Sequence, residues 1–196
     1  MSILARGTHE THTHGLLKDD SFESQHARDE ASHSVSPIAR QALAVLRVAF
    51  GFTFLWAFVD KLFGLGYSTK SADSWLNGGS PTTGFLKFGA KGPFKGFYNS
   101  IAGDVWVNWL FMAALLALGV ALILGIGMRL AGIGGVILYL MMWTVAMPPE
   151  TNPVIDDHIL GAISIAVLSL TMAGNTWGFG KAWAKTPLAE KFPILR

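Results

Sequence analysis

The apolar positions of the chain gather in four long runs separated by polar or glycine-rich segments. The runs cover about residues 37–66, 105–128, 130–147 and 153–173. Each run is close to the ~20 residues that a helix needs to cross a hydrocarbon core about 30 Å thick, and the third is the shortest. A capping residue precedes proline at Ser36-Pro37 and at Asn152-Pro153, which predicts that the first and fourth helices begin there. The pattern therefore predicts an all-α membrane protein, a bundle of four transmembrane helices.

The segment between the first two runs, residues 67–104, is divided by glycine and proline into short aromatic stretches. Such a segment is too interrupted to span a bilayer and is typical of short amphipathic helices that lie in the membrane interface. We predict interfacial short helices in this first loop, with aromatic rings among the lipid head groups. These rings belong to Trp75, Phe85, Phe88, Phe94, Phe97 and Tyr98.

Both ends of the chain are polar. Residues 1–36 are rich in serine, threonine and histidine and contain no apolar stretch, which predicts a disordered tail without a cleaved signal. The run from His9 to His14 could instead chelate a metal ion. The membrane domain is expected over residues 37–183 and a C-terminal tail over residues 184–196.

Lysine and arginine are distributed unevenly over the predicted loops. One side of the membrane carries the N-terminal tail, Arg129 in the short second loop, and the basic residues near the C-terminus. The third loop, residues 147–156, contains no lysine or arginine. Because short cytoplasmic loops accumulate basic residues, we predict a multi-pass protein of the cytoplasmic (inner) cell membrane with both termini inside.

The composition agrees with a lipid environment and excludes several functions. Charged residues make up 14% of the chain, below the ~25% of soluble domains. The net charge of +2, without a basic stripe, argues against nucleic acid as a partner. The absence of cysteine excludes disulfides, thiolate chemistry and cysteine-ligated iron–sulfur clusters. His158 is the only histidine in the predicted bundle, so haem held by two histidines is not expected.

Small residues recur every four positions in the first two helices. This spacing places them on one helix face, where small side chains allow two backbones to approach closely in lipid. We predict that the helices pack through these ridges. The ridge residues are Ala49, Thr53 and Ala57 in the first helix, and Ala113, Ala117, Ala121 and Gly125 in the second.

Ionisable residues flank a short apolar stretch in the first helix. Residues 48–59 rise only about 18 Å at ~1.5 Å per residue, which is less than the hydrocarbon thickness. Either Arg47 or the pair Asp60-Lys61 therefore lies below the head groups, where charges are functional candidates. The alternative for the two long basic side chains is snorkelling to the interface. Asp60 has a short side chain and is expected to need a partner.

The third loop and the start of the fourth helix concentrate titratable side chains. Glu150, Asp156, Asp157 and His158 fall within nine residues of one another. Acidic residues near a helix N-terminus favour its dipole, but this does not explain the histidine beside them. Carboxylates favour the protonated form of a neighbouring imidazole, which suits a proton donor. We assign candidate catalytic roles to His158, Asp156 and Glu150; metal binding by Asp156, Asp157 and His158 is the weaker alternative.

Several stretches, in order along the chain, read LRVAFGFTFLWAFVDKLFGLGY, NGGSPTTGF, GPFKGFY, ALILGIGMRLAGIGG and PPETNPVIDDHI. Together they cover about residues 40–183. They resemble the DoxX family and most closely its DoxD-like branch, the membrane subunit of thiosulfate:quinone oxidoreductases. The resemblance implies a four-helix inner-membrane protein, in some cases a subunit of a quinone-linked assembly with a small extracytoplasmic partner. By position it implies roles for Arg47, Lys61, Glu150, Asn152, Asp156 and His158.

Two functions fit these features. In a quinone-linked oxidoreductase subunit, the first and third loops would form a pocket at head-group level, with His158 or a carboxylate delivering the proton that accompanies quinone reduction. In the alternative, a non-catalytic accessory or assembly subunit docks onto a respiratory membrane complex. A small transporter is less well supported, because the sequence contains no inverted repeat. The candidate cofactor-binding residues of the first function are Arg47, Lys61, Trp56, Trp143 and Asn152.

Overall fold

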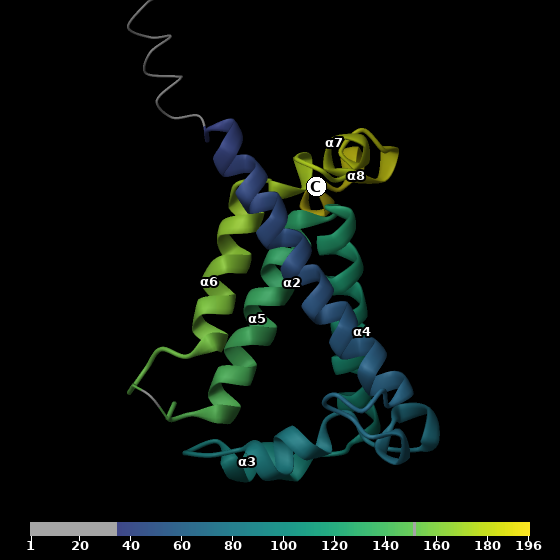
Figure 1. Ribbon diagram of the computed structural model, residues 1–196, viewed down its shortest axis with the longest axis vertical. Coiled ribbons are helices and arrows are strands. Elements are labelled where there is room, and N and C mark those ends of the chain that lie inside the picture. Colours follow the sequence, from purple (N-terminus) through teal and green to yellow (C-terminus); the bar gives the residue numbers. More distant parts are fainter. Residues whose placement is uncertain (1–34, 151) are drawn as a thin grey trace, which may run out of the picture. The chain divides into compact units, whose positions relative to one another are not determined.

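The computed structural model describes residues 35–150 and 152–196, which form helices joined by turns and contain no strand. Within these residues, three helices are long and apolar enough to cross a membrane. Figure 1 shows α4 and α5 side by side, with α2 crossing over them and α6 along α5. The prediction of an all-helical fold with apolar helices of spanning length is therefore confirmed, with three such helices in place of the four predicted. The helices are α2 (Pro37–Phe63), α4 (Val105–Leu124), α5 (Met128–Ala146) and α6 (Asp157–Leu170).

The fourth apolar run forms a shorter helix than the sequence predicts. α6 contains 14 residues and rises about 21 Å at ~1.5 Å per residue, so α6 is shorter than α5. Asp156 caps it, because its carboxylate accepts hydrogen bonds from the backbone N–H of His158 and of the next residue. Asn152, the predicted cap, instead accepts a hydrogen bond from the backbone N–H of Val154. The helix therefore starts after the stronger, charged cap.

α2 and α4 meet at two glycines outside the predicted small-residue ridges, of which only Gly125 is buried, against Gly174 and Arg47. α2 contacts α4 at Gly51 and Gly119, where a Cβ atom on Gly119 would lie 2.8 Å from the backbone nitrogen of Leu55. The ridge prediction is wrong because four-residue spacing identifies a possible face, whereas the crossing geometry selects the face that is used. The ridge residues that the structure leaves exposed are Ala49, Thr53, Ala113 and Ala117.

α5 and α6 pack closely along their length. A Cβ atom on Gly132 would lie 2.4 Å from Ser169 Oγ, and one on Gly135 would lie 2.9 Å from a side-chain carbon of Ile165. Glycine on α5 therefore lets α6 approach until its side chains touch the α5 backbone. The buried core that results includes Met112, Leu118, Leu122, Ile165 and Leu168.

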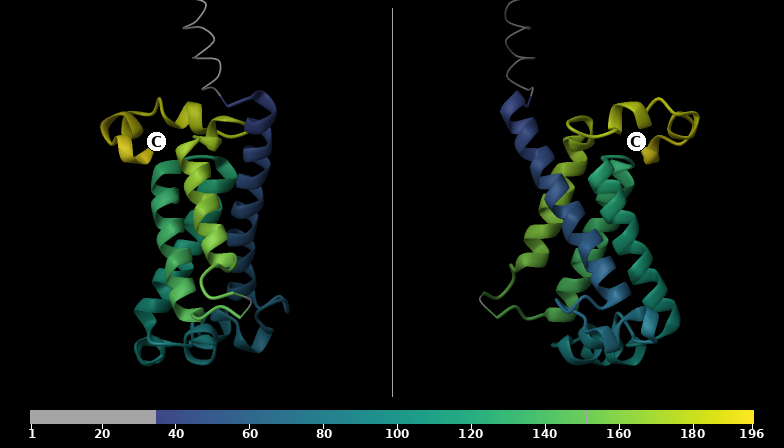
Figure 2. Two further views of the ribbon diagram at one scale, coloured as in Figure 1. Left: turned by 90° about the vertical axis from the view of Figure 1, so that its left-hand side faces the viewer. Right: turned by 45° about the vertical axis from the view of Figure 1, so that its right-hand side comes forward.

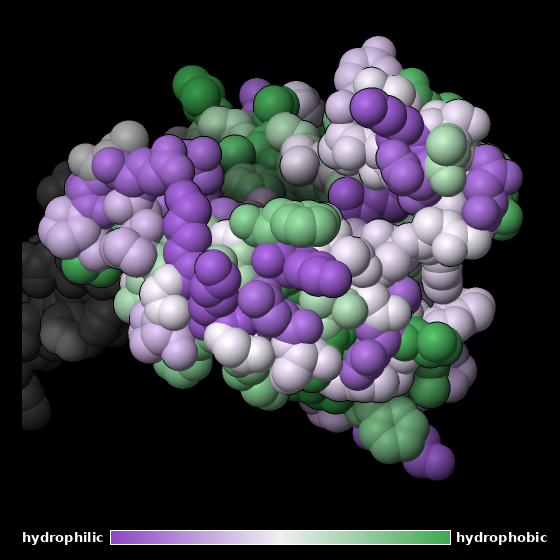
Figure 3. Space-filling model, turned by 90° about the horizontal axis from the view of Figure 1, so that it is seen from below, coloured by the Kyte–Doolittle hydropathy of each residue, from purple (hydrophilic) through white to green (hydrophobic). Residues whose placement is uncertain are grey.

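The segment between α2 and α4 folds over one end of the helices. Figure 3 looks onto this end and shows hydrophilic side chains gathered across it. Phe88 and Phe97 are exposed there, but Tyr98, expected among the head groups, is buried and its hydroxyl lies 2.6 Å from Thr144 Oγ1. The short elements of this segment are η1 (Ser71–Asp73), η2 (Trp75–Asn77), η3 (Gly84–Gly89) and α3 (Lys95–Ile101).

The residues predicted to form a C-terminal tail fold back at the other end of the helices (Figure 2). The backbone N–H of Arg129 donates to the carbonyl oxygen of Arg196 at 2.9 Å. The guanidinium of Arg129 donates to the carbonyl oxygen of Pro193 at 3.1 Å. The segment is therefore anchored to the start of α5. The predicted disordered N-terminal tail and its histidine run fall on residues 1–34, outside the described residues. The C-terminal elements are η4 (Ala173–Asn175), α7 (Gly180–Trp183), α8 (Pro187–Lys191) and η5 (Pro193–Leu195).

Candidate functional site

The start of α6 brings His158 and Asp156 into direct contact. Nδ1 of His158 lies 2.7 Å from Asp156 Oδ2, while Oδ1 of the same carboxylate accepts the backbone N–H of His158 at 3.0 Å. The carboxylate therefore orients the imidazole and caps the helix at the same time. Nε2 of His158 has no hydrogen-bond partner among the described residues. This nitrogen is available to a ligand, as general acid–base chemistry requires.

The hydrogen bonds of Asp156 also set its ionisation. Burial raises the pKa of the Asp156 carboxyl, but the hydrogen bonds from the His158 side chain and from the backbone N–H of Ile159 lower it more. The net effect is a pKa below the ordinary value of this group. Asp156 is therefore ionised at neutral pH and places a negative charge beside the imidazole.

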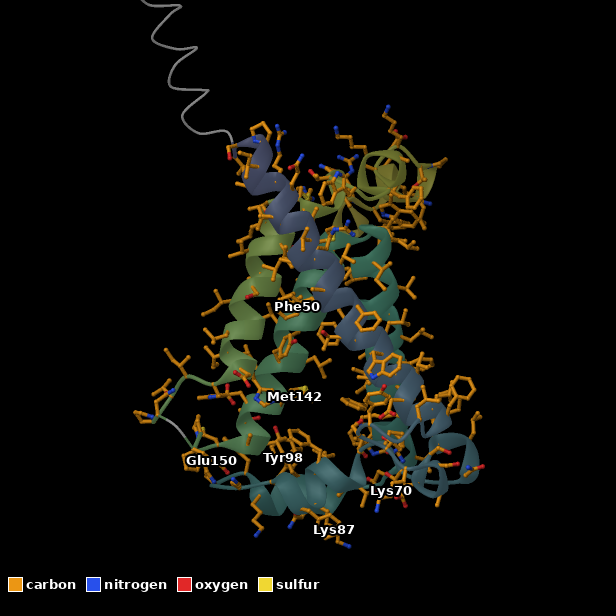
Figure 4. The ribbon with its side chains drawn as sticks, viewed as in Figure 1. Phe50, Lys70, Lys87, Tyr98, Met142 and Glu150 are labelled. Atoms are coloured by element: carbon orange, nitrogen blue, oxygen red, sulfur yellow. The ribbon has the colours of Figure 1, made fainter. Side chains whose placement is uncertain are left out.

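His158 opens onto a cavity of about 490 Å³ between α2, α5 and α6, named here the histidine cavity. Phe50 of α2 and Met142 of α5, both labelled in Figure 4, belong to its wall. The volume lies within the ~300–1,000 Å³ of small-molecule sites, which are largely apolar with a few convergent polar groups. The polar members of its lining are Thr53, Lys61, Tyr139, Asp157, His158 and Ser164.

Tyr139 is a member of this site that the sequence analysis did not select. Its ring meets the His158 ring at 6.4 Å between centroids and the Phe50 ring edge-on at 6.1 Å. A single tyrosine within an apolar run gives no signal until the face it occupies is known. The packing of α5 against α6 places its ring beside the histidine, as part of the cavity wall.

A second cavity of about 430 Å³ lies between α4, α5 and the η3–α3 segment, and is named here the apolar cavity. Its lining is almost entirely aliphatic and aromatic. Lys61, Phe111 and Met142 line both cavities. Among the residues that the structure describes, the Lys61 ammonium has one hydrogen bond, a long one of 3.5 Å to Ser68 Oγ, beside the charge of Asp60. Its position in both linings places it near a ligand at this junction.

Arg47 is not brought to the histidine cavity. It is fully buried near the C-terminal end of α4, and its two terminal guanidinium nitrogens donate to backbone carbonyl oxygens, while Nε has no partner among the described residues. The last carbonyl groups of a helix have no partner within it, so Arg47 replaces the missing N–H donors. It neither snorkels nor faces either cavity. Its acceptors are the carbonyl oxygens of Leu122, Ile123, Thr176 and Trp177.

Asp60 has the partners that its position required. Its carboxylate is 1% exposed and accepts hydrogen bonds from the backbone N–H of Tyr67 at 3.3 Å and of Ser68 at 2.9 Å. The Ser68 hydroxyl adds a third bond at 2.6 Å. The residue therefore fastens the turn that follows α2.

The remaining predicted site residues hold loops and line neither cavity. Glu150 is exposed and pairs with Lys91 at 2.6 Å, a hydrogen bond that lowers the pKa of Glu150. Trp143 donates its indole N–H to a backbone carbonyl in the α5–α6 loop at 2.8 Å. Trp56 stacks on a phenylalanine one turn away, and Asn152 stabilises a turn in its own loop. Of the predicted residues, the histidine cavity thus collects His158 and Lys61, with Asp156 behind the histidine.

Comparisons of the chain with protein-family models, curated proteins and solved structures found no match. Among the described residues, no group of three or more histidine, cysteine, aspartate or glutamate side chains is placed to hold a metal ion. The functional interpretation therefore rests on the two cavities and on the polar groups at their walls.

Proposed function

We propose that the chain is the integral membrane subunit of a quinone-linked oxidoreductase, of the DoxD-like type that its motifs resemble. The observation that carries this proposal is an oriented His158–Asp156 pair at the wall of an apolar, aromatic-lined cavity. A quinone ring is planar and apolar and bears two carbonyl acceptors, so it suits aromatic walls with a few hydrogen-bond donors. A bound quinone takes up two electrons and two protons, and a donor held by a partner subunit supplies the electrons.

In this proposal, each polar residue at the histidine cavity has its own role in ligand binding or proton transfer. Nε2 of His158 would donate a hydrogen bond, and then its proton, to one carbonyl oxygen of the ring. Asp156 accepts from Nδ1 and holds the imidazole in this orientation. The Lys61 ammonium, at the junction of the two cavities, would supply the second proton to the other carbonyl oxygen. The Tyr139 ring packs beside the histidine and limits the position of the ligand.

The proposed membrane arrangement has four spans with both termini on the cytoplasmic side of the inner cell membrane. α2, α4 and α5 cross the bilayer, and α6 is a shorter fourth span that local thinning of the bilayer accommodates. The loop between α2 and α4 and the loop between α5 and α6 then face the extracytoplasmic side. The elements of the first loop lie in the interface, and His158 takes its proton from that side.

The test replaces His158 with alanine in the purified protein and measures equilibrium binding of a tail-less benzoquinone. Loss of the hydrogen bond from Nε2 is expected to weaken binding about tenfold or more, while the variant still unfolds cooperatively on heating. Ile163→Ala, on an exposed position of the same helix that lines neither cavity, is the matched control and is expected to bind normally.

The competing function predicts a different result. If the chain is a non-catalytic accessory subunit, both variants assemble with the respiratory complex and support oxygen uptake like the wild type. Normal quinone binding by His158→Ala, or no binding by the wild-type protein, would contradict the oxidoreductase proposal and favour the accessory role.

A further inference from the structure

The two cavities are adjacent compartments that meet at one group of side chains. Lys61 from α2, Phe111 from α4 and Met142 from α5 contribute to the lining of both. Two of these three side chains are long and unbranched and can move by rotation about several bonds. A ligand that fills one compartment can therefore continue past this junction into the other.

The chemistry of the two compartments differs sharply. The apolar cavity includes two hydroxyl groups, but both are already engaged within the protein. Thr82 Oγ1 donates to Asn108 Oδ1 at 2.6 Å, and the Tyr98 hydroxyl lies 2.6 Å from Thr144 Oγ1. A polar ligand in this cavity would lose hydrogen bonds to water or lipid head groups without replacement. Beyond the junction, the cavity accepts hydrocarbon.

The apolar cavity also reaches the outer surface of the helices. Its lining includes Leu110 of α4 and Ile137 of α5, whose exposed fractions are 59% and 53%. In the proposed membrane arrangement these positions face lipid. A flexible hydrocarbon chain can therefore leave the cavity between α4 and α5 and enter the bilayer.

We infer that one amphiphilic ligand occupies both compartments, with a quinone ring in the histidine cavity and its isoprenoid tail in the apolar cavity. This inference rests on the proposed function. A phospholipid acyl chain has the same hydrocarbon chemistry, but its anionic phosphate would lie near Asp157 as well as Lys61, so the lining offers it no net positive charge. An uncharged ring needs none. The tail compartment makes the site selective for quinones that carry a chain.

The experiment compares a tail-less benzoquinone with the same ring bearing a two-isoprene tail, by calorimetric titration of the full chain in detergent. Ala114 lines the apolar cavity one turn beyond Phe111 on the same face of α4. Ala114→Leu is expected to weaken binding of the tailed ring about tenfold, because filling an occupied site is costly, and to leave the tail-less ring unaffected. The neighbouring exposed Ala113, which lines neither cavity, gives the matched control Ala113→Leu, expected to bind both rings normally.

A second variant protects the test against misfolding. A Cβ atom on Gly134 meets only Leu118 Cδ2, at 3.9 Å, so Gly134→Leu can extend into the apolar cavity without a backbone clash. It is expected to reproduce the selective loss. The inference is overturned if both cavity variants bind the tailed ring normally, or if they weaken both rings equally.

Failure of the proposed function has a separate signature, since the wild-type protein would then bind neither ring. A third result assigns the cavity to lipid and also overturns the inference. In that case the wild type binds both rings with equal Kd and purifies with phospholipid that Ala114→Leu removes.

Discussion

Arg47 and His158 are both ionisable side chains in apolar surroundings, and their contacts give them different roles. Arg47 directs both terminal guanidinium nitrogens to backbone carbonyl oxygens near the end of α4 and lines neither cavity. His158 uses one ring nitrogen for Asp156, keeps the other free of partners among the described residues, and lines the histidine cavity. A buried charge bonded to the backbone away from any cavity indicates a structural residue, whereas an oriented side chain with a free nitrogen at a cavity indicates a site.

Replacement of Arg47 by alanine is expected to lower the free energy of unfolding in detergent by about 3 kcal/mol. The substitution leaves several carbonyl groups near the end of α4 without a donor in a buried position. Arg40→Ala, on an exposed position of the same helix, is the control and is expected to change stability by less than ~0.5 kcal/mol. Equal stability of the two variants in chemical denaturation would show that the carbonyl groups find other donors.

The lowered pKa of Asp156 predicts a pH-dependent contribution to stability. A carboxyl whose pKa is lower in the folded than in the unfolded state stabilises the fold at any pH above its unfolded-state pKa. This contribution is lost as the pH falls through the folded-state pKa. Between about pH 6 and about pH 3, the melting temperature of the wild type should therefore fall more steeply than that of Asp156→Asn. Asp157→Asn, which changes an exposed neighbour, should retain the wild-type slope. Parallel curves for wild type and Asp156→Asn would exclude the contribution.

At the scale of the helices, backbone approach at glycine determines the arrangement around the cavities. Gly119 lets α4 touch the backbone of α2, and Gly132 and Gly135 let α6 touch α5. Residues of α2, α5 and α6 together form most of the wall of the histidine cavity. The cavity therefore lies between two closely packed helix pairs and is kept open by them.

Gly119→Ala is expected to destabilise the protein by about 1–3 kcal/mol, because the new methyl group would lie 2.8 Å from the Leu55 backbone, which cannot move aside alone. Gly134→Ala is the matched control: its methyl group has room, and alanine favours a helix over glycine by up to about 1 kcal/mol. Thermal unfolding of both variants in one detergent provides the comparison. A Gly119→Ala protein as stable as Gly134→Ala would mean that α2 and α4 can separate freely.

At the scale of the whole described chain, each end of the helices is joined by contacts between distant segments. At one end, Lys91 of the first loop pairs with Glu150 of the α5–α6 loop. At the other, Arg129 binds the C-terminal residues at Pro193 and Arg196. Successive antiparallel helices place alternate loops at the same end. The first and third loops therefore meet at one end, and the second loop meets the C-terminal residues at the other. The proposed topology places the first of these ends on the extracytoplasmic side and the second in the cytoplasm.

Cysteine labelling tests that proposal directly, because the chain contains no cysteine of its own. Ser100→Cys in α3 and Lys185→Cys beyond α7 place single thiols at exposed positions at the two ends. In intact cells, an impermeant maleimide is expected to label the first and not the second, since the basic C-terminal side is cytoplasmic. Both should react after permeabilisation. Labelling of the second thiol alone would reverse the orientation and move the histidine to the inner side.

The sequence alone predicted the helical class with apolar spans and the proximity of His158 to the carboxylates of Asp156 and Asp157. Apolar runs of spanning length have few stable alternatives in lipid, where backbone groups must bond internally, and two residues separated by one position at a helix start cannot be far apart. Local capping chemistry was harder to predict, since Asn152-Pro153 and Asp156 both qualify as helix starts and the carboxylate prevails.

Only the tertiary structure decided which polar residues share a cavity. Arg47 directly precedes the apolar stretch of residues 48–59 and Lys61 follows it by two positions, yet one binds the end of α4 and the other lines both cavities. Tyr139 gave no sequence signal and became part of the site through the face that α5 turns toward α6. Helix spacing defines faces, but the crossing of α2 over α4 depends on where glycine allows close approach. This crossing depends on contacts between segments far apart in the chain, so no local sequence pattern predicts it.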